Sequence, residues 1–212
     1  MKLSSDIKTI FKENESITFG QFIQKISHKS FGVMLVVLAI PSALPLPAAG
    51  YSVPFGIILT VLAIQMILNK KYVWFPNWIN NRSLPTSKDA KLLNGMVKFL
   101  EFFENLLKPR LKILSKGLFY RVLGILVLLC AISMIIPIPL TNTIPAFGVF
   151  LVGLGLLEED GFFILAGLIS AIIGLSLTTT ILYFFAILGR EGINLVQDNF
   201  DKVIISIKNT IL

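Results

Sequence analysis

The sequence contains only one cysteine, Cys130, and one histidine, His28. An intramolecular disulfide needs two cysteines and the usual zinc site needs several Cys or His ligands, so we expect neither, and no metal or cofactor. Charged residues are scarce as well, and Asp, Glu, Lys and Arg together make up 15% of the 212 residues. This composition differs from that of an ordinary soluble domain and is typical of a chain immersed in lipid.

Three stretches carry no charged residue at all, namely residues 30–69, 122–157 and 161–189. Each is longer than the roughly 20 residues that a helix needs to cross about 30 Å of hydrocarbon. We therefore expect an all-α integral membrane protein that crosses the membrane more than once. These stretches contain no nucleophile motif, phosphate-binding loop or carboxylate pair that would indicate an enzyme. We therefore predict no catalytic residue.

The basic residues lie beside these stretches. Of the 19 Lys and Arg residues, five precede residue 30, eleven lie in 70–121 and three follow residue 189. Basic flanks are typical of cytoplasmic loops that face anionic lipid, so the N-terminus and the 70–121 loop are predicted to be cytoplasmic. Membrane lipids, rather than nucleic acid, are the expected partners.

Two prolines separated by one residue interrupt each of the first two stretches. Pro45-Leu46-Pro47 is followed 92 residues later by Pro137-Ile138-Pro139, and at the same offset Gly32 matches Gly124. Proline blocks helix continuation, so we predict two repeated, broken helical hairpins. The predicted parts of a single membrane domain (1–212) are repeat 1 (about 18–69), an amphipathic linker (70–110), repeat 2 (about 111–157), a membrane segment (161–189) and an amphipathic tail (190–212).

The hairpins either span the bilayer with short helices or enter and leave on the same side. Phe31 to Leu44 is 14 residues, roughly 21 Å as a helix, which favours the re-entrant form. The segment 161–189 is predicted to be one long helix, although a third break would also fit, so the side of the C-terminus stays open. Its small residues at steps of four predict close helix packing and a homodimer: Ala166, Ser170, Gly174 and Thr178.

Amphipathic segments are expected at the membrane surface. Thr18 and Gln21 predict a capping box, and the apolar face of the helix that follows is expected in the headgroup plane. The aromatic and basic residues after the first stretch predict an interfacial belt: Lys70, Lys71, Trp74 and Trp78. Glu158-Glu159-Asp160 is expected to be a solvated loop.

A set of motifs lies along the chain, namely Phe31-Gly32, Ala39-Ile40-Pro41, Leu44-Pro45-Leu46-Pro47, Ala63-Ile64-Gln65, Arg82-Ser83-Leu84-Pro85, Leu107-Lys108-Pro109-Arg110-Leu111, Ile136-Pro137-Ile138-Pro139, Asn142, Pro145-Ala146 and Gly155-Leu156-Leu157-Glu158-Glu159-Asp160-Gly161. Together these motifs resemble the exopolysaccharide synthesis ExoD family over roughly residues 16–189. The central segment has lysine and asparagine where the family is usually rich in arginine. The resemblance implies a bacterial inner-membrane protein connected with exopolysaccharide production.

Two functions fit this sequence. The first is a small translocator of a solute, ion or lipid, because paired interrupted segments in corresponding halves are typical of transport sites. Its predicted lining residues are Ser42, Pro45, Pro47, Ser52, Gln65, Pro137, Pro139, Thr141, Asn142 and Thr143. The second is a scaffold or regulator that does not transport and that docks polysaccharide synthesis proteins.

Overall fold

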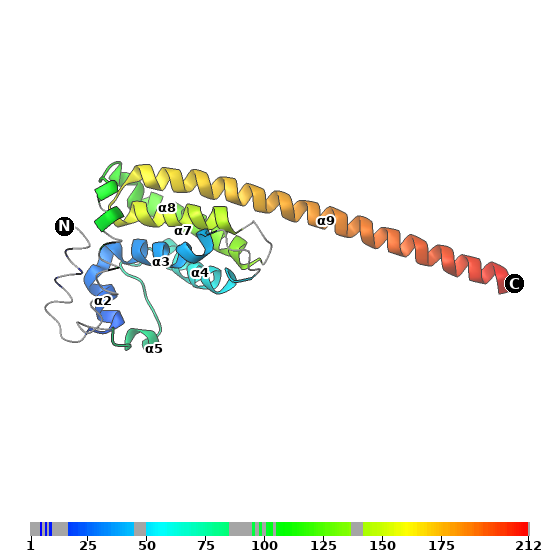
Figure 1. Ribbon diagram of the computed structural model, residues 1–212, viewed down its shortest axis with the longest axis horizontal. Coiled ribbons are helices and arrows are strands. Elements are labelled where there is room, and N and C mark those ends of the chain that lie inside the picture. The colour runs from blue at the N-terminus through cyan, green and yellow to red at the C-terminus, as the bar shows by residue number, and fades with distance from the viewer. Residues whose placement is uncertain are drawn as a thin grey trace. The chain divides into compact units, whose positions relative to one another are not determined.

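Helices form nearly all of the regular structure, as the sequence predicts. The computed structural model describes residues 17–44, 50–84, 101–103, 105–136 and 142–211, with single positions at 5, 7, 9, 95 and 98; for 28, 190 and 192–211 it describes the backbone alone. The helices are α2 (Phe19–Ile26), α3 (Ser30–Ala43), α4 (Val53–Ile67), α5 (Asn77–Asn80), α7 (Gly117–Ile135), α8 (Thr143–Leu157) and α9 (Gly161–Ile211), with 3-10 turns η1 (Ser27–Lys29) and η3 (Lys112–Ser115) (Figure 1). Within the described ranges, one isolated bridge between Thr18 and Ser83 is the extent of strand pairing.

The chain divides into two units, Met1–Leu175 and Ser176–Leu212. The first contains every helix up to α8 and the beginning of α9. The second continues as helix to Ile211.

The two predicted repeats pack reciprocally within the first unit. Helix α3 packs against α8, and α4 packs against α7 (Figure 1). Gly32, near the start of α3, touches Leu157 at the end of α8, and its counterpart Gly124, near the start of α7, touches Ile67 at the end of α4. The first helix of each repeat therefore lies antiparallel to the second helix of the other.

This antiparallel arrangement gives the bundle two different ends. The end of α3 and the start of α4 lie at one end together with the end of α7 and the start of α8, and we call it the break end. The other end contains Lys29, the residues after α4, the start of α7 and Glu158, and we call it the charged end.

The local effect of the prolines on the first helix of each repeat is confirmed. Helix α3 tolerates Pro41 but ends before its C-cap residue Leu44, which is extended at φ −77° and ψ 136°. Helix α7 likewise ends before its C-cap residue Ile136, which is extended at φ −75° and ψ 117°. Each of these residues precedes a proline, and a proline ring disfavours the helical conformation of the residue before it. Pro45, Pro47, Pro137, Pro139 and Thr141 themselves lie outside the described residues.

Small residues bring α8 and the beginning of α9 into close contact. A Cβ at Gly148 would lie 2.7 Å from the backbone nitrogen of Ala171, and one at Gly167 would lie 2.7 Å from that of Val152. The predicted small-residue stripe contributes to this contact, because Gly174 packs on Pro145 and the Ser170 hydroxyl donates to the Ile144 carbonyl at 3.3 Å. Much of this stripe is therefore used inside the chain, and the homodimer stays a prediction.

The capping box before α2 is confirmed, but the predicted position of its apolar face is wrong. The Gln21 backbone amide donates to Thr18 Oγ1 at 3.3 Å, and the Thr18 backbone amide donates to Gln21 Oε1 at 3.1 Å. Phe22 and Ile23 are 5% and 1% exposed, so they are covered by protein rather than by headgroups. The helix also contacts the segment around α5, where the Phe19 and Phe75 rings meet edge to face.

Two described helices are long and apolar enough to cross a membrane: α7, and α9 over Gly161–Gly189. A third candidate arises if α2 and α3, which are bent by 118° to one another, form one broken span. Helices α4 and α8 are apolar but shorter, with 15 residues each.

Candidate functional site

The break end contains two buried hydroxyl groups beside the first break. Ser42, in the last turn of α3, and Ser52, at the start of α4, are both fully buried. Within the described part of the chain neither hydroxyl has a hydrogen-bond partner. An unsatisfied buried polar group costs about 1 to 3 kcal/mol, so these two positions are unusual.

Other predicted lining residues lie at the same end. Asn142 is the N-cap residue of α8 and Thr143 is its first helical residue, and both are half-buried. The Tyr51 hydroxyl donates to the Leu44 carbonyl at 2.9 Å, which closes the first hairpin across its break. The antiparallel packing of α3 on α8 thus brings Ser42 to the same end as Asn142 and Thr143.

Gln65 does not belong to this group. It lies in the last turn of α4, about 18 Å along the helix axis from Val53. Its side-chain amide donates to the Trp74 carbonyl at 3.1 Å, and its Oε1 accepts from the Trp74 backbone nitrogen at 2.7 Å. Gln65 therefore holds the chain that follows α4, at the charged end.

The residues predicted for an interfacial belt are all exposed. Trp74 and Trp78 are 57% and 69% exposed, and Lys70 and Lys71 are exposed beside them. The segment that carries them is fixed in place, because the Val73 amide also donates to the Ser30 hydroxyl at 3.3 Å. The residues predicted for the belt are therefore exposed side chains on a segment that is held in place by hydrogen bonds.

The acidic triplet after α8 is not the solvated loop that the sequence predicts. Asp160 is 1% exposed, and its carboxylate accepts from the backbone nitrogens of Lys108 at 2.8 Å and Phe162 at 3.0 Å. It caps the start of α9, where an anionic acceptor is favourable. Its neighbours Glu158 and Glu159 form ion pairs instead.

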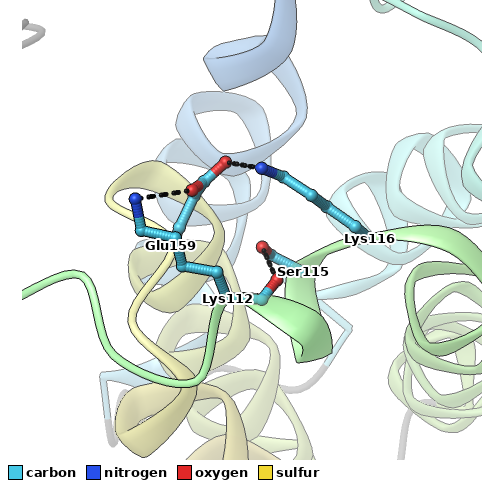
Figure 2. A network of polar contacts seen from close by, with 4 residues as sticks. All are labelled: Lys112, Ser115, Lys116 and Glu159. Atoms are coloured by element: carbon cyan, nitrogen blue, oxygen red, sulfur yellow. Dashed lines mark hydrogen bonds and ion pairs between the residues drawn. The ribbon is translucent and has the colours of Figure 1, made fainter.

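These ion pairs connect distant parts of the chain. Lys29 Nζ lies 2.5 Å from Glu158 Oε1. Glu159 lies 2.8 Å from Lys116 and 3.6 Å from Lys112, and Figure 2 shows the two ammonium groups on either side of its carboxylate. Within η3, the Ser115 hydroxyl donates to the Lys112 carbonyl at 2.8 Å.

The hydrogen bond with Lys116 has the largest effect on the pKa of the Glu159 carboxyl. Together with the charges of Lys116 and Lys112, it lowers the pKa of the Glu159 carboxyl below its ordinary value, against a smaller opposing effect of burial. Glu159 therefore stays ionised to a lower pH than an ordinary glutamate does.

A cavity of about 670 Å³ opens among these charges. Its walls come from the start of α3, the chain after α4, the turn before α7 and the end of α8. We call it the basic cavity, and its lining residues are Lys29, Phe31, Asn69, Lys70, Lys71, Pro109, Lys112, Ser115, Lys116, Gly117, Tyr120, Leu156, Leu157, Glu158 and Glu159. Five lysines face two glutamates, so the lining has three more positive than negative charges.

This cavity was not predicted from the sequence, although a signal for it is present. Two repeats that begin and end on the same side must bring their flanking charges to one end, and Lys29, Lys70 and Lys116 flank the apolar stretches. The residues described here bring no group of three His, Cys, Asp or Glu side chains together as metal ligands. Lysine ammonium groups are the most numerous charged groups in the lining of the cavity.

The fold and the cavity define a membrane-associated helical protein with a basic site at one end of its bundle. The family follows from comparison with known proteins. A family model described as "Exopolysaccharide synthesis, ExoD" matches residues 3–180, and the chain belongs to this family.

Two relatives illustrate the similarity. An uncharacterized protein of Synechocystis, slr1875, is 37% identical over 189 residues, which are 87% of this chain and 89% of the relative. Protein ExoD of Rhizobium meliloti is 26% identical over 178 residues, which are 82% of this chain and 71% of the relative. No solved structure matches the chain.

Proposed function

We propose that the protein resides in the bacterial inner membrane and moves a small solute, an ion or a lipid in connection with exopolysaccharide production. The observation that carries this proposal is the burial of the Ser42 and Ser52 hydroxyls, without partners among the described residues, beside the break in the first repeat. A polar cargo held at the break end would supply those partners. Paired interrupted segments in two halves of a chain also favour a transport site between them.

The proposed topology follows from charge and helix length. The basic residues of the charged end favour the cytoplasmic side, so we propose that the N-terminus and the 70–121 loop lie there. Helix α3 has 14 residues, roughly 21 Å, and α4 has 15, so the first hairpin is short for a full crossing and suits a re-entrant form. The break end would then lie within the membrane.

Transport by the purified protein in liposomes tests this function. We expect wild-type liposomes to lose trapped glucose or potassium ions, or to flip a fluorescent phospholipid, faster than empty ones. The double variant Ser42→Ala with Ser52→Ala should lose that flux while its unfolding temperature stays equal or rises, because two unsatisfied hydroxyls are removed. Thr60→Val is the matched control, since the Thr60 hydroxyl already donates to the Gly56 carbonyl at 2.9 Å.

Two outcomes would contradict transport. One is wild-type flux no faster than that of empty liposomes for all three cargoes. The other is a serine double variant that transports as fast as the wild type, which would make the buried hydroxyls structural.

The second function, a scaffold or regulator of a polysaccharide synthesis complex, is favoured by the long helix of the C-terminal unit. The helix continues beyond Gly189 to Ile211, and the sequence of this part is amphipathic. Co-purification of a glycosyltransferase or polymerase with the full chain, and its loss when 190–212 are deleted, would favour this function. Recovery of the protein alone would count against it.

A further inference from the structure

We propose that the basic cavity binds a phosphate-bearing group. The inference rests on the charged end of the bundle and goes beyond the transport proposal, which rests on the break end. Lys70 and Lys71 line the cavity, and no ion pair to either is formed by any residue that the structure describes.

The paired lysines also remain available to a ligand. Lys112 and Lys116 share a single carboxylate, that of Glu159, at 3.6 Å and 2.8 Å. Each ammonium group has three donors, and one carboxylate does not use them all. A phosphate has several charged oxygens and accepts hydrogen bonds from several ammonium groups at once, which a singly charged carboxylate ligand does less well.

The size and walls of the cavity favour phosphate attached to an organic group. A volume of about 670 Å³ is within the range of small-molecule sites, about 300 to 1,000 Å³, and larger than a phosphate ion needs. Phe31, Tyr120 and Leu156 supply apolar and aromatic walls. The Phe31 and Tyr120 rings meet edge to face with centroids 6.0 Å apart, so this wall is packed and preformed.

The position of the cavity allows two sources for the phosphate. It lies at the start of α7, a candidate membrane span, and its lining includes the exposed Lys70 and Lys71. A lipid headgroup would reach it from the membrane surface, and a soluble phosphate ester would reach it from water. Both present the same chemistry to the lysines, and binding experiments distinguish them.

The test uses the full-length protein in a mild detergent at low salt. Calorimetric titrations with pyrophosphate probe the soluble source, and titrations with dioctanoyl phosphatidic acid probe the lipid source, with dioctanoyl phosphatidylcholine as the uncharged comparison. We expect at least one of the two phosphate probes to bind and its affinity to fall as salt is added. Binding of pyrophosphate alone assigns the soluble source, and binding of phosphatidic acid alone assigns the lipid.

Charge variants identify the cavity as the place of binding. Lys70→Gln with Lys71→Gln should weaken binding by at least about tenfold, since each lysine near a bound phosphate contributes a severalfold factor. Lys25→Gln with Lys98→Gln removes the same charge from exposed positions outside the cavity and should change the affinity less than about twofold.

Glu159→Gln gives a change of opposite sign. It frees Lys112 and Lys116 and should tighten binding, a result that a folding defect would not produce. The proposal is overturned if neither phosphate probe binds, if the control pair weakens binding as much as the Lys70 and Lys71 pair, or if Glu159→Gln leaves the affinity unchanged or weakens it.

Discussion

Gly32 of α3 and Gly153 of α8 meet backbone to backbone. A Cβ on Gly32 would lie 2.9 Å from the Gly153 carbonyl oxygen, and a Cβ on Gly153 would lie 2.9 Å from the Leu35 side chain. The same kind of contact recurs in the other pair of helices, where a Cβ on Gly124 would lie 3.0 Å from the Ile67 backbone nitrogen. This reciprocity is what a duplicated unit would produce, and it makes the stability of the bundle depend on residues without side chains.

Gly32→Ala and Gly124→Ala are therefore expected to destabilise the protein. The added methyl group would press on backbone atoms that cannot rotate away, at a cost of about 1 to 3 kcal/mol for each change. Thermal unfolding in detergent measures the effect. The control is Gly189→Ala, because a Cβ there meets nothing within 4 Å and alanine is the better helix former. Equal unfolding temperatures for Gly32→Ala and the control would contradict the observed packing.

Asp160→Ala is expected to destabilise the junction between α8 and α9. It leaves the backbone nitrogens of Lys108 and Phe162 without their acceptor and removes the cap of α9, which together cost about 2 kcal/mol. Asp160→Asn keeps one acceptor oxygen and should recover part of the loss. Glu191→Ala, an exposed acidic position of the same helix, is the control for thermal unfolding. Equal losses in Asp160→Ala and Glu191→Ala would show that the cap is unimportant.

Gln65→Leu is expected to loosen the chain after α4 without acting through the break end. The change leaves both the N–H and the C=O of Trp74 unpaired, so we expect a loss of about 1 to 3 kcal/mol and a shift in tryptophan fluorescence. Gln65→Glu keeps the acceptor and should lose less. If Gln65→Leu unfolded at the same temperature as the wild type but no longer transported, Gln65 would instead be a lining residue of the transport site.

Local features of the fold were predictable from the sequence because their causes are local. Leu44 and Ile136 leave the helical conformation because a proline follows each of them. Thr18 and Gln21 form their capping box three residues apart. In each case the interacting groups are neighbours in the chain.

Features that depend on which helices pair were not predictable in this way. Lys29 and Glu158 form an ion pair across 129 positions, and only the antiparallel packing of α3 on α8 brings them together. The sequence pattern of α2 gives an apolar face that either lipid or protein could cover. In the structure α2 packs on protein, where it contacts Phe75. The basic cavity was missed for the same reason, since its lysines come from segments far apart in the chain.

Acidic pH is expected to weaken the charged end through Glu159. The pKa of this carboxyl is lowered in the folded protein, first by its hydrogen bond to Lys116, so its contribution to stability is present above the ordinary value near 4.5. The contribution is lost as the pH falls through the lower folded pKa, because protonation then removes both ion pairs. Unfolding temperatures measured from neutral to acidic pH should show the wild type more stable than Glu159→Gln at neutral pH and the difference shrinking at the acid end. Glu191→Gln, at an exposed position, should show a much smaller change. A difference between wild type and Glu159→Gln that stays constant with pH would mean that the two lysines do not stabilise the folded protein through this carboxylate.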